Sequence, residues 1–264
     1  MSAVPGPIAA VGLHVVRQPG DGTGPPAVVV HGTMDRSSSF GRVARQLGET
    51  ALVRYDRRGY GRSVDAGVAT LDEHVDDLVA LLDEKPAALF GHSLGGVIAF
   101  IAASRRPDLV TAVLSYETPT PWTEWWPARR RPAPRAAGDP ADEAEQFMRR
   151  TVGDDIWERL PARTRADRRA EGGALRSDLA GMADGRAPFD PAAITVPVIS
   201  ATGDQTTWWH RRAAEELAAS LPAGELEVVE GAGHGVHLTH PAATAELVRR
   251  VRAAGRAVDG SSGH

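Results

Sequence analysis

Short apolar runs alternate with longer amphipathic stretches along most of this chain. The runs at 27–30 and 110–116 are continuously apolar or nearly so, which is typical of strands buried on both faces of a parallel sheet. Between such runs, apolar residues recur at helical spacing, as at Leu71, Val75 and Leu78. The alternation predicts an α/β protein with a mostly parallel twisted sheet flanked by helices.

The same pattern gives boundaries for the other elements. Further strands are expected at 8–17, 50–55, 87–90, 194–201 and 226–230. Further helices are expected at 40–47, 97–104, 211–221 and 241–254, and Pro86 stops the helix that begins at Leu71. Residues 255–264, which are rich in glycine and serine, are predicted to form a flexible tail.

The alternation is interrupted between residues 118 and 188. This segment holds several prolines and the four tryptophans Trp122, Trp125, Trp126 and Trp157, and helical spacing returns at 141–151, 154–160 and 165–182. A disordered linker is the alternative, but tryptophans at helical spacing need a surface to pack on. We therefore predict a helical lid at 118–188, inserted into a core made of residues 1–117 and 189–254.

Composition narrows the class of protein. A chain of 264 residues suits one such domain with an insertion, and its net charge of −4 gives no reason to expect nucleic acid as a partner. Without cysteine, disulfides and thiolate chemistry are excluded. The sequence shows neither a signal peptide pattern nor 18 consecutive apolar residues. The expectation is a cytoplasmic monomer or homodimer that acts on a small molecule and binds no membrane.

A serine framed by glycines follows the apolar run at 87–90. The sequence Gly91-His92-Ser93-Leu94-Gly95-Gly96 precedes an apolar helix, which is the strand-turn-helix context of a nucleophile elbow. Small residues at Gly91 and Gly95 are needed there because strand and helix approach closely. Chance occurrence of this pattern is the alternative, and the flanking strand and helix argue against it. The pattern predicts Ser93 as a nucleophile.

A serine nucleophile needs a base, and the base needs a carboxylate. His234 lies in a glycine-framed loop and Asp204 follows a predicted strand, so the order is Ser93, Asp204, His234. Thr33 follows the His31-Gly32 turn, where its N–H is a candidate donor to an oxyanion. His31 itself is interpreted as a structural hydrogen-bonding residue.

Taken together, these motifs resemble the serine-nucleophile branch of the α/β-hydrolase superfamily, which includes esterases and cofactor-free haloperoxidases. The resemblance implies that Ser93 is the nucleophile, His234 the base and Asp204 the acid, and that the N–H groups of Leu94 and Thr33 form the oxyanion hole. It implies no cofactor. Glu117 is the alternative acid, because some members of the superfamily keep theirs at that place.

The predicted reaction is hydrolysis of an ester-type bond through an acyl-enzyme on Ser93. Thioester, lactone or carbon-carbon bond hydrolysis and perhydrolase activity use the same triad, and a catalytically silent binding protein is a further alternative. Aromatic walls would suit a small apolar substrate, whereas the same tryptophans could instead anchor the lid. The predicted pocket residues are Met34, Trp122, Trp126, Trp157 and Trp208.

Three histidines, His234, His237 and His240, have a spacing that suggests metal binding. Gly235 and Pro241 argue against a regular helix that would bring their rings together. No metal site is expected.

Overall fold

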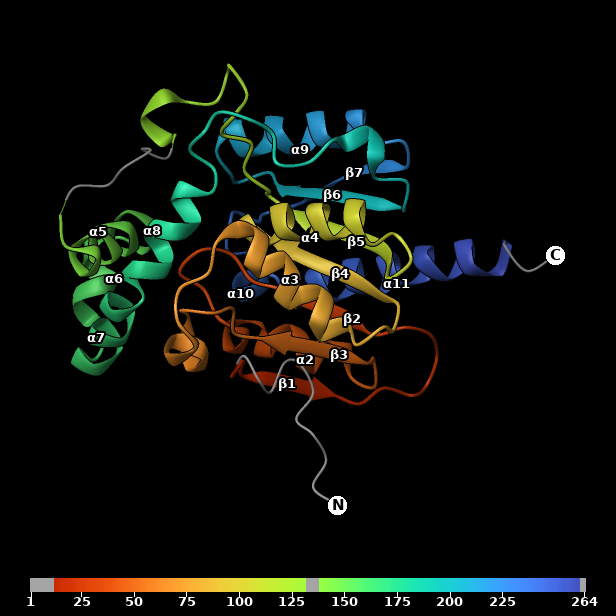
Figure 1. The fold of residues 1–264 in the computed structure, drawn as a ribbon, viewed down its shortest axis with the longest axis horizontal. Coiled ribbons are helices and arrows are strands. Elements are labelled where there is room, and N and C mark those ends of the chain that lie inside the picture. Colours follow the sequence, from red (N-terminus) through yellow and green to blue (C-terminus); the bar gives the residue numbers. More distant parts are fainter. Residues whose placement is uncertain (1–11, 132–137, 262–264) are drawn as a thin grey trace.

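The computed structural model of the protein describes residues 12–131 and 138–261, and it confirms the predicted parallel sheet flanked by helices (Figure 1). Within these residues seven strands form one sheet in the order β1-β3-β2-β4-β5-β6-β7. Only β1 runs antiparallel to its neighbour. The strands are β1 (Val15–Gln18), β2 (Ala27–Val30), β3 (Leu52–Tyr55), β4 (Ala87–His92), β5 (Val110–Tyr116), β6 (Val198–Gly203) and β7 (Gly224–Val229).

Both faces of the sheet are covered because its central strands are apolar on both sides. Val28 and Leu89 point to one face, where they pack in a cluster with residues of α3 (Leu71–Leu82), α4 (Leu94–Arg105) and α9 (Trp208–Ser220). Val29 and Phe90 point to the other, against α2 (Gly41–Leu47) and α11 (Pro241–Ser261). The alternation along each strand explains why successive residues enter different clusters.

A capping box explains why α3 begins where it does. The hydroxyl of Thr70 accepts from the N–H of Glu73, and the Glu73 carboxylate accepts from the N–H of Thr70. Such reciprocal caps satisfy two backbone donors that the first turn of a helix leaves free. The turn after β3 is closed by Asp56, which accepts from the N–H of Arg62 at 2.9 Å.

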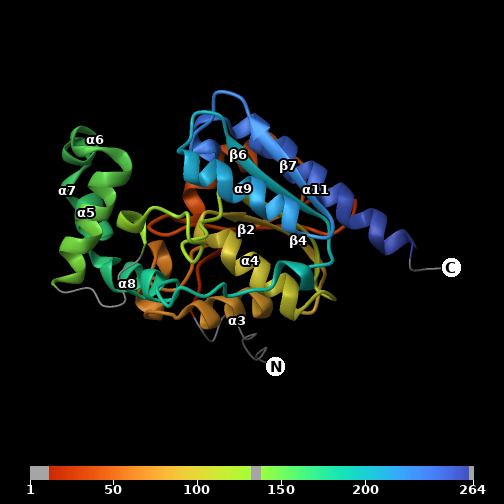
Figure 2. The same cartoon turned by 90° about the horizontal axis from the view of Figure 1, so that it is seen from above.

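Between β5 and β6 the described residues include four α-helices that lie beside the sheet, at the left of Figures 1 and 2. They are α5 (Pro140–Val152), α6 (Asp154–Arg159), α7 (Ala162–Ala170) and α8 (Gly172–Ala180). The helix expected at 165–182 is divided in two, because the chain turns at Glu171. A side chain on Gly172 would overlap the carbonyl of Pro140, so the close approach of α5 and α8 requires glycine here.

Several predicted boundaries need correction. The strand expected at 194–201 runs from Val198 to Gly203 as β6. The helix expected to end at residue 254 continues to Ser261 as α11, so most of the expected flexible tail is helical. Of the opening strand expected at 8–17, residues 8–11 lie outside the described part of the chain, and the strand in the described part runs from Val15 to Gln18. Short connecting helices complete the fold: η1 (Ser37–Phe40), η2 (Gly61–Ala66), η3 (Ala128–Arg130), η4 (Pro191–Ala193) and α10 (Val236–Thr239).

Parallel strands direct their carboxyl ends to one edge of the sheet, and the predicted chemistry gathers there. Ser93 follows β4, Glu117 follows β5 and Asp204 follows β6. Adjacent strands are in register at this edge, with His92 opposite Tyr116. No helix in the described ranges is long and apolar enough to cross a membrane.

Candidate active site

Ser93 occupies a sharp turn between β4 and α4. Its φ of 54° and ψ of −125° lie in a region that residues other than glycine rarely adopt. Two hydrogen bonds hold the turn: the Ser93 N–H donates to the carbonyl of Tyr116 at 2.9 Å, and its carbonyl accepts from Gly96 at 2.8 Å. The side chain lines a cavity at the carboxyl edge of the sheet, as a nucleophile elbow requires.

The glycines around Ser93 are needed for close approach. A Cβ atom on Gly91 would lie 2.5 Å from the Cα atom of Gly96, and one on Gly95 would overlap the carbonyl oxygen of Val30. Neither overlap can be relieved without moving the backbone. The glycine spacing in the sequence therefore has a steric cause.

Two backbone donors lie beside the serine. A Cβ atom on Gly32 would lie 2.9 Å from Ser93 Cβ, so the turn after β2 packs directly against the elbow. The N–H groups of Thr33 and Leu94 donate no hydrogen bond to any described residue. Leu94 begins α4, where an N–H has no partner within the helix. Both groups are thus available to a negatively charged oxygen near Ser93.

His234 is bonded to Glu117. The Nδ1 atom of His234 lies 2.7 Å from Oε2 of Glu117, whose side chain is completely buried after β5. The other carboxylate oxygen accepts from the Thr202 hydroxyl at 3.2 Å and the Gly203 N–H at 3.1 Å. A carboxylate held in this way fixes the ring of His234 and leaves its Nε2 atom as the proton acceptor.

The expected pairing of Asp204 with His234 is wrong. Asp204 is exposed, and its carboxylate accepts from the N–H of Gly231 at 2.8 Å. It makes no hydrogen bond or ion pair with His234, and Glu117, the alternative acid, occupies that position instead. Asp204 thereby stabilises the turn at the start of the histidine loop. The physical reason lies in the contacts at this edge: the N–H of Gly231 engages Asp204, whereas the Thr202 hydroxyl and the Gly203 N–H hold Glu117 beside His234.

A second histidine shares the same carboxylate. His210, in the first turn of α9, has Nδ1 3.3 Å from Oε2 of Glu117, and its ring stacks on His234 with centroids 4.8 Å apart. Burial would raise the pKa of Glu117, but hydrogen bonds from His210 and His234 outweigh it and hold this pKa well below its usual range. Burial lowers the pKa of His210. His210 was not among the predicted site residues, because it lies within a helix without a recognisable motif.

The cavity has a volume of about 1370 Å³ and contains Ser93, His234, Thr33 and Met34 among its lining residues. Of the predicted pocket residues, only Met34 lines it. The other four predicted residues, all tryptophans, do not line the cavity. The prediction of aromatic walls is therefore wrong. Trp157 is buried among the inserted helices, and Trp122 packs against Phe189. Trp126 is buried beside His210. Trp208 is half exposed and packs against Trp125 and Trp209. Large indole surfaces are used here to attach the insertion to the core.

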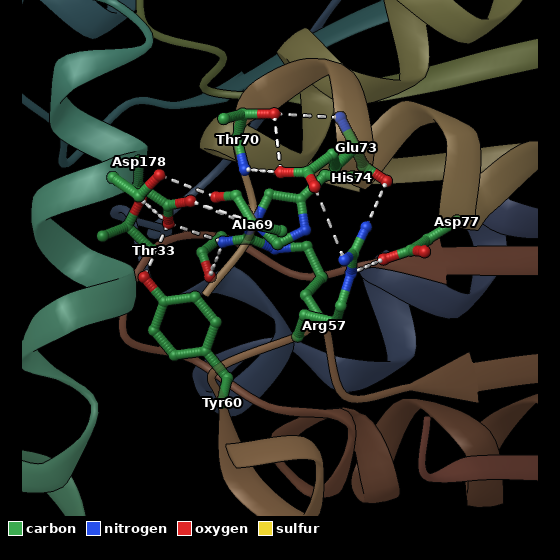
Figure 3. Close-up of polar contacts among 12 residues, drawn as sticks. Thr33, Arg57, Tyr60, Ala69, Thr70, Glu73, His74, Asp77 and Asp178 are labelled. Atoms are coloured by element: carbon green, nitrogen blue, oxygen red, sulfur yellow. Dashed lines mark hydrogen bonds and ion pairs between the residues drawn. The ribbon is translucent and has the colours of Figure 1, made fainter. Parts of the chain in front are cut away.

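A buried ion pair ties α8 to the turn that carries Thr33 (Figure 3). Asp178 accepts from two nitrogens of Arg57 at 2.9 and 2.8 Å, from the Tyr60 hydroxyl at 2.6 Å and from the Thr33 hydroxyl at 3.0 Å. Burial would raise the pKa of Asp178, but the charge of Arg57 outweighs it and holds this pKa far below its usual range. The inserted helices are therefore coupled to the proposed oxyanion donor through one charged network.

The interpretation of His31 as structural fits its contacts. Its Nε2 accepts from the N–H of Arg57 at 2.9 Å, and Nδ1 lies 2.8 Å from the carbonyl of Gly32. Burial, together with the charge of Arg57, lowers the pKa of His31 to about 4. The ring is therefore neutral near pH 7 and has both nitrogens occupied.

Two groups of side chains within the described ranges bring three metal-binding atoms within 4.8 Å of one another: Asp35, His92, His237, and Glu117, His210, His234. The second group is already joined by the hydrogen bonds around Glu117. Neither group contains His240, so the histidines considered from the sequence do not converge as a set.

Comparison with known proteins assigns the family. The model of the Alpha/beta hydrolase family matches residues 27–247, which is most of the chain. The chain belongs to this family. The match spans the elbow, Glu117 and His234, so the residues of the candidate site all lie within the family region.

Relatives of this α/β hydrolase are named as lipases, esterases and lactonases. Lipase LipV of Mycobacterium tuberculosis is 37% identical over 108 residues, which is 39% of this chain and only 41% of the lipase. Esterase YbfF of Escherichia coli is 25% identical over 252 residues, covering 85% of this chain and 92% of the esterase. The solved enol-lactonase of Burkholderia xenovorans has a TM-score of 0.68 and 23% identity, covering 90% of this chain and 95% of the lactonase. That last likeness shows the fold alone.

Proposed function

We propose that this α/β hydrolase is a serine hydrolase that cleaves an ester-type bond through an acyl-enzyme on Ser93. The proposal rests chiefly on one observation: His234, bonded to the buried carboxylate of Glu117 at 2.7 Å, lines the same cavity as Ser93. A neutral serine hydroxyl is a weak nucleophile, and an imidazole oriented by a carboxylate is the usual means of activating it. The triad is Ser93, His234 and Glu117.

In the acylation step, Oγ of Ser93 attacks the carbonyl carbon while Nε2 of His234 takes the hydroxyl proton. The carbonyl oxygen becomes an oxyanion, which the N–H groups of Thr33 and Leu94 stabilise. Removal of one such donor costs roughly 3 to 4 kcal/mol in other hydrolases. The tetrahedral intermediate then breaks the ester bond, and His234 returns its proton to the departing alcohol.

In the second step, water replaces the alcohol. His234 takes a proton from the water as its oxygen attacks the acyl carbon, and collapse of the intermediate releases the acid and restores Ser93. Glu117 stays ionised throughout and stabilises the imidazolium that forms in each step. Its low pKa, which results from its hydrogen bonds to two histidines despite burial, suits this role.

The helices α5–α8 form the proposed lid. Phe147, Met148 and Leu179 from these helices line the cavity that contains Ser93. They provide an apolar wall for the non-reacting part of a substrate, which favours its transfer from water. The wall is aliphatic and phenyl in character because the tryptophans are used in packing.

Substitution of Ser93 by alanine tests the proposal. We expect the wild-type protein to hydrolyse members of a panel of esters, thioesters and lactones, and the Ser93→Ala variant to lose this activity by several orders of magnitude. Ser104→Ala, a serine near the end of α4 and away from the cavity lining, is the matched control. Equal activity of the Ser93→Ala and wild-type proteins would contradict the proposal.

A further inference from the structure

The solvent-accessible part of the cavity lining, here called its mouth, is rich in arginine. Five arginines contribute to the lining: Arg129, Arg130, Arg131, Arg150 and Arg168. Asp35 is the one carboxylate among the described lining residues, and it lies 3.4 Å from His237. This concentration of positive charge contrasts with the net charge of −4 of the whole chain.

Within the described ranges, three of these arginines, Arg129, Arg130 and Arg150, lack the ion pairs that other arginines of the inserted segment form. Arg149, Arg169 and Arg176 each form an ion pair with a carboxylate on α5. In contrast, the side chains of Arg129, Arg130 and Arg150 form no hydrogen bond or ion pair with any residue that the structure describes. Their guanidinium groups are thus available to an anion that enters the cavity.

Other contacts orient two of the arginines. The guanidinium of Arg130 lies over the ring of Trp209, 5.6 Å from its centroid, which restricts its motion and favours a planar partner edge. Arg168 donates to the carbonyl of Met34 at 2.9 Å and pairs with Glu171. Arg130 and Arg168 come from separate segments, so the positive charge is spread around the mouth.

We infer that the natural substrate carries an anionic group, a carboxylate or a phosphate, which Arg129, Arg130 and Arg150 bind while the reacting carbonyl lies at Ser93. This inference rests on the proposed hydrolase function, and it narrows the substrates of that function to molecules that carry an anionic group. Guanidinium groups bind carboxylates and phosphates through paired hydrogen bonds. The cavity volume of about 1370 Å³ leaves room for an anion at the mouth and a reacting group at the elbow of the same molecule. The apolar substrate expected from the sequence is replaced by one with a charged end.

Two matched substrate pairs distinguish the sources of the anion. The first compares 4-nitrophenyl hydrogen adipate with 4-nitrophenyl hexanoate, which differ by a terminal carboxylate on the acyl chain. The second compares S-butyryl phosphopantetheine with S-butyryl pantetheine, which differ by a phosphate on the leaving group. We expect at least one anionic member to be preferred by about tenfold or more in kcat/KM, the ratio that one charge-assisted contact provides. The preference should shrink as salt is added.

Variants locate the effect. The double substitution Arg130→Met and Arg150→Met should reduce the anionic-to-neutral ratio of kcat/KM by about tenfold or more, whereas Arg45→Met, an exposed arginine on α2, should leave it unchanged. Calorimetric titration with adipate and with phosphopantetheine tests anion binding without turnover, so it separates this inference from the proposed reaction. A ratio near one in both pairs, or no binding of either anion by the wild-type protein, would overturn it.

Discussion

Replacing Glu117 with glutamine is expected to lower the turnover of a cleavable ester by roughly 10³- to 10⁴-fold, as loss of the orienting carboxylate does in other triads. Glutamine keeps the size of the side chain but presents neutral groups to both histidines that now bond to Oε2. The ring of His234 then loses the partner that fixes its tautomer and stabilises its imidazolium. Steady-state kinetics on the purified variant measure the effect.

Asp204→Asn is the matched control for this substitution. Its carboxylate accepts only from the N–H of Gly231, and an asparagine side-chain oxygen can accept the same bond. We therefore expect the Asp204→Asn enzyme to keep most of its turnover. Near-normal rates for Glu117→Gln together with a collapse for Asp204→Asn would show that the acid is Asp204 after all.

Replacing Asp178 with alanine should give the largest loss of stability. The side chains of Arg57 and Asp178 are both completely buried, and removal of one partner of a buried pair leaves an uncompensated charge. The typical cost is about 3 to 5 kcal/mol in the free energy of unfolding. Urea denaturation followed by circular dichroism measures it, with the refolded protein checked for reversibility.

The control for Asp178 is Glu246→Ala, since Glu246 pairs with Arg249 on α11, where both side chains are exposed. Exposed pairs contribute little to stability, so this variant should unfold at nearly the wild-type urea concentration. If the Asp178 variant unfolds there too, the network in Figure 3 does not stabilise the protein as described.

The fold was predictable where one physical signal dominates. Strands β2 and β5 match their expected boundaries and α3 begins at the expected Leu71, because continuous apolar runs and helical spacing mark these positions. Helix α3 ends at Leu82, before the expected stop at Pro86. The division of α7 from α8 was not predictable, because it depends on the approach of Gly172 to the carbonyl of Pro140. That contact joins residues on two different helices and leaves no periodic trace in the sequence.

The site was predictable only in part, because some of its features are required locally and others depend on contacts that form only in the folded protein. Ser93 and His234 are marked by their glycine-framed turns, which the backbone geometry requires locally. The choice between Glu117 and Asp204 depends instead on which carboxylate the folded edge directs at the ring of His234 and which it engages elsewhere. One available signal was that Glu117 directly follows the apolar strand at Val110–Tyr116, where a buried carboxylate needs partners.

The role of the tryptophans could not be predicted for a different reason. An indole ring suits an apolar pocket wall and a packing contact equally well, and the sequence pattern is the same for both. Trp157 is buried with Met34 and Tyr60 in a cluster that joins the insertion to the core. The arginines at the cavity mouth could not be singled out from the sequence either. Contacts between helices decide which arginines pair with carboxylates and which do not, and these contacts exist only in the folded protein.

Labelling with a fluorophosphonate tests the central claim most directly, because an activated serine attacks the phosphorus of such a reagent and displaces fluoride to form a stable adduct. The account predicts one adduct on the peptide that contains Ser93, found by mass spectrometry of the folded protein. The adduct should be absent from the Ser93→Ala variant and should form much more slowly in Glu117→Gln. A folded wild-type protein that acquires no adduct at Ser93 would contradict the assignment of this residue as the nucleophile.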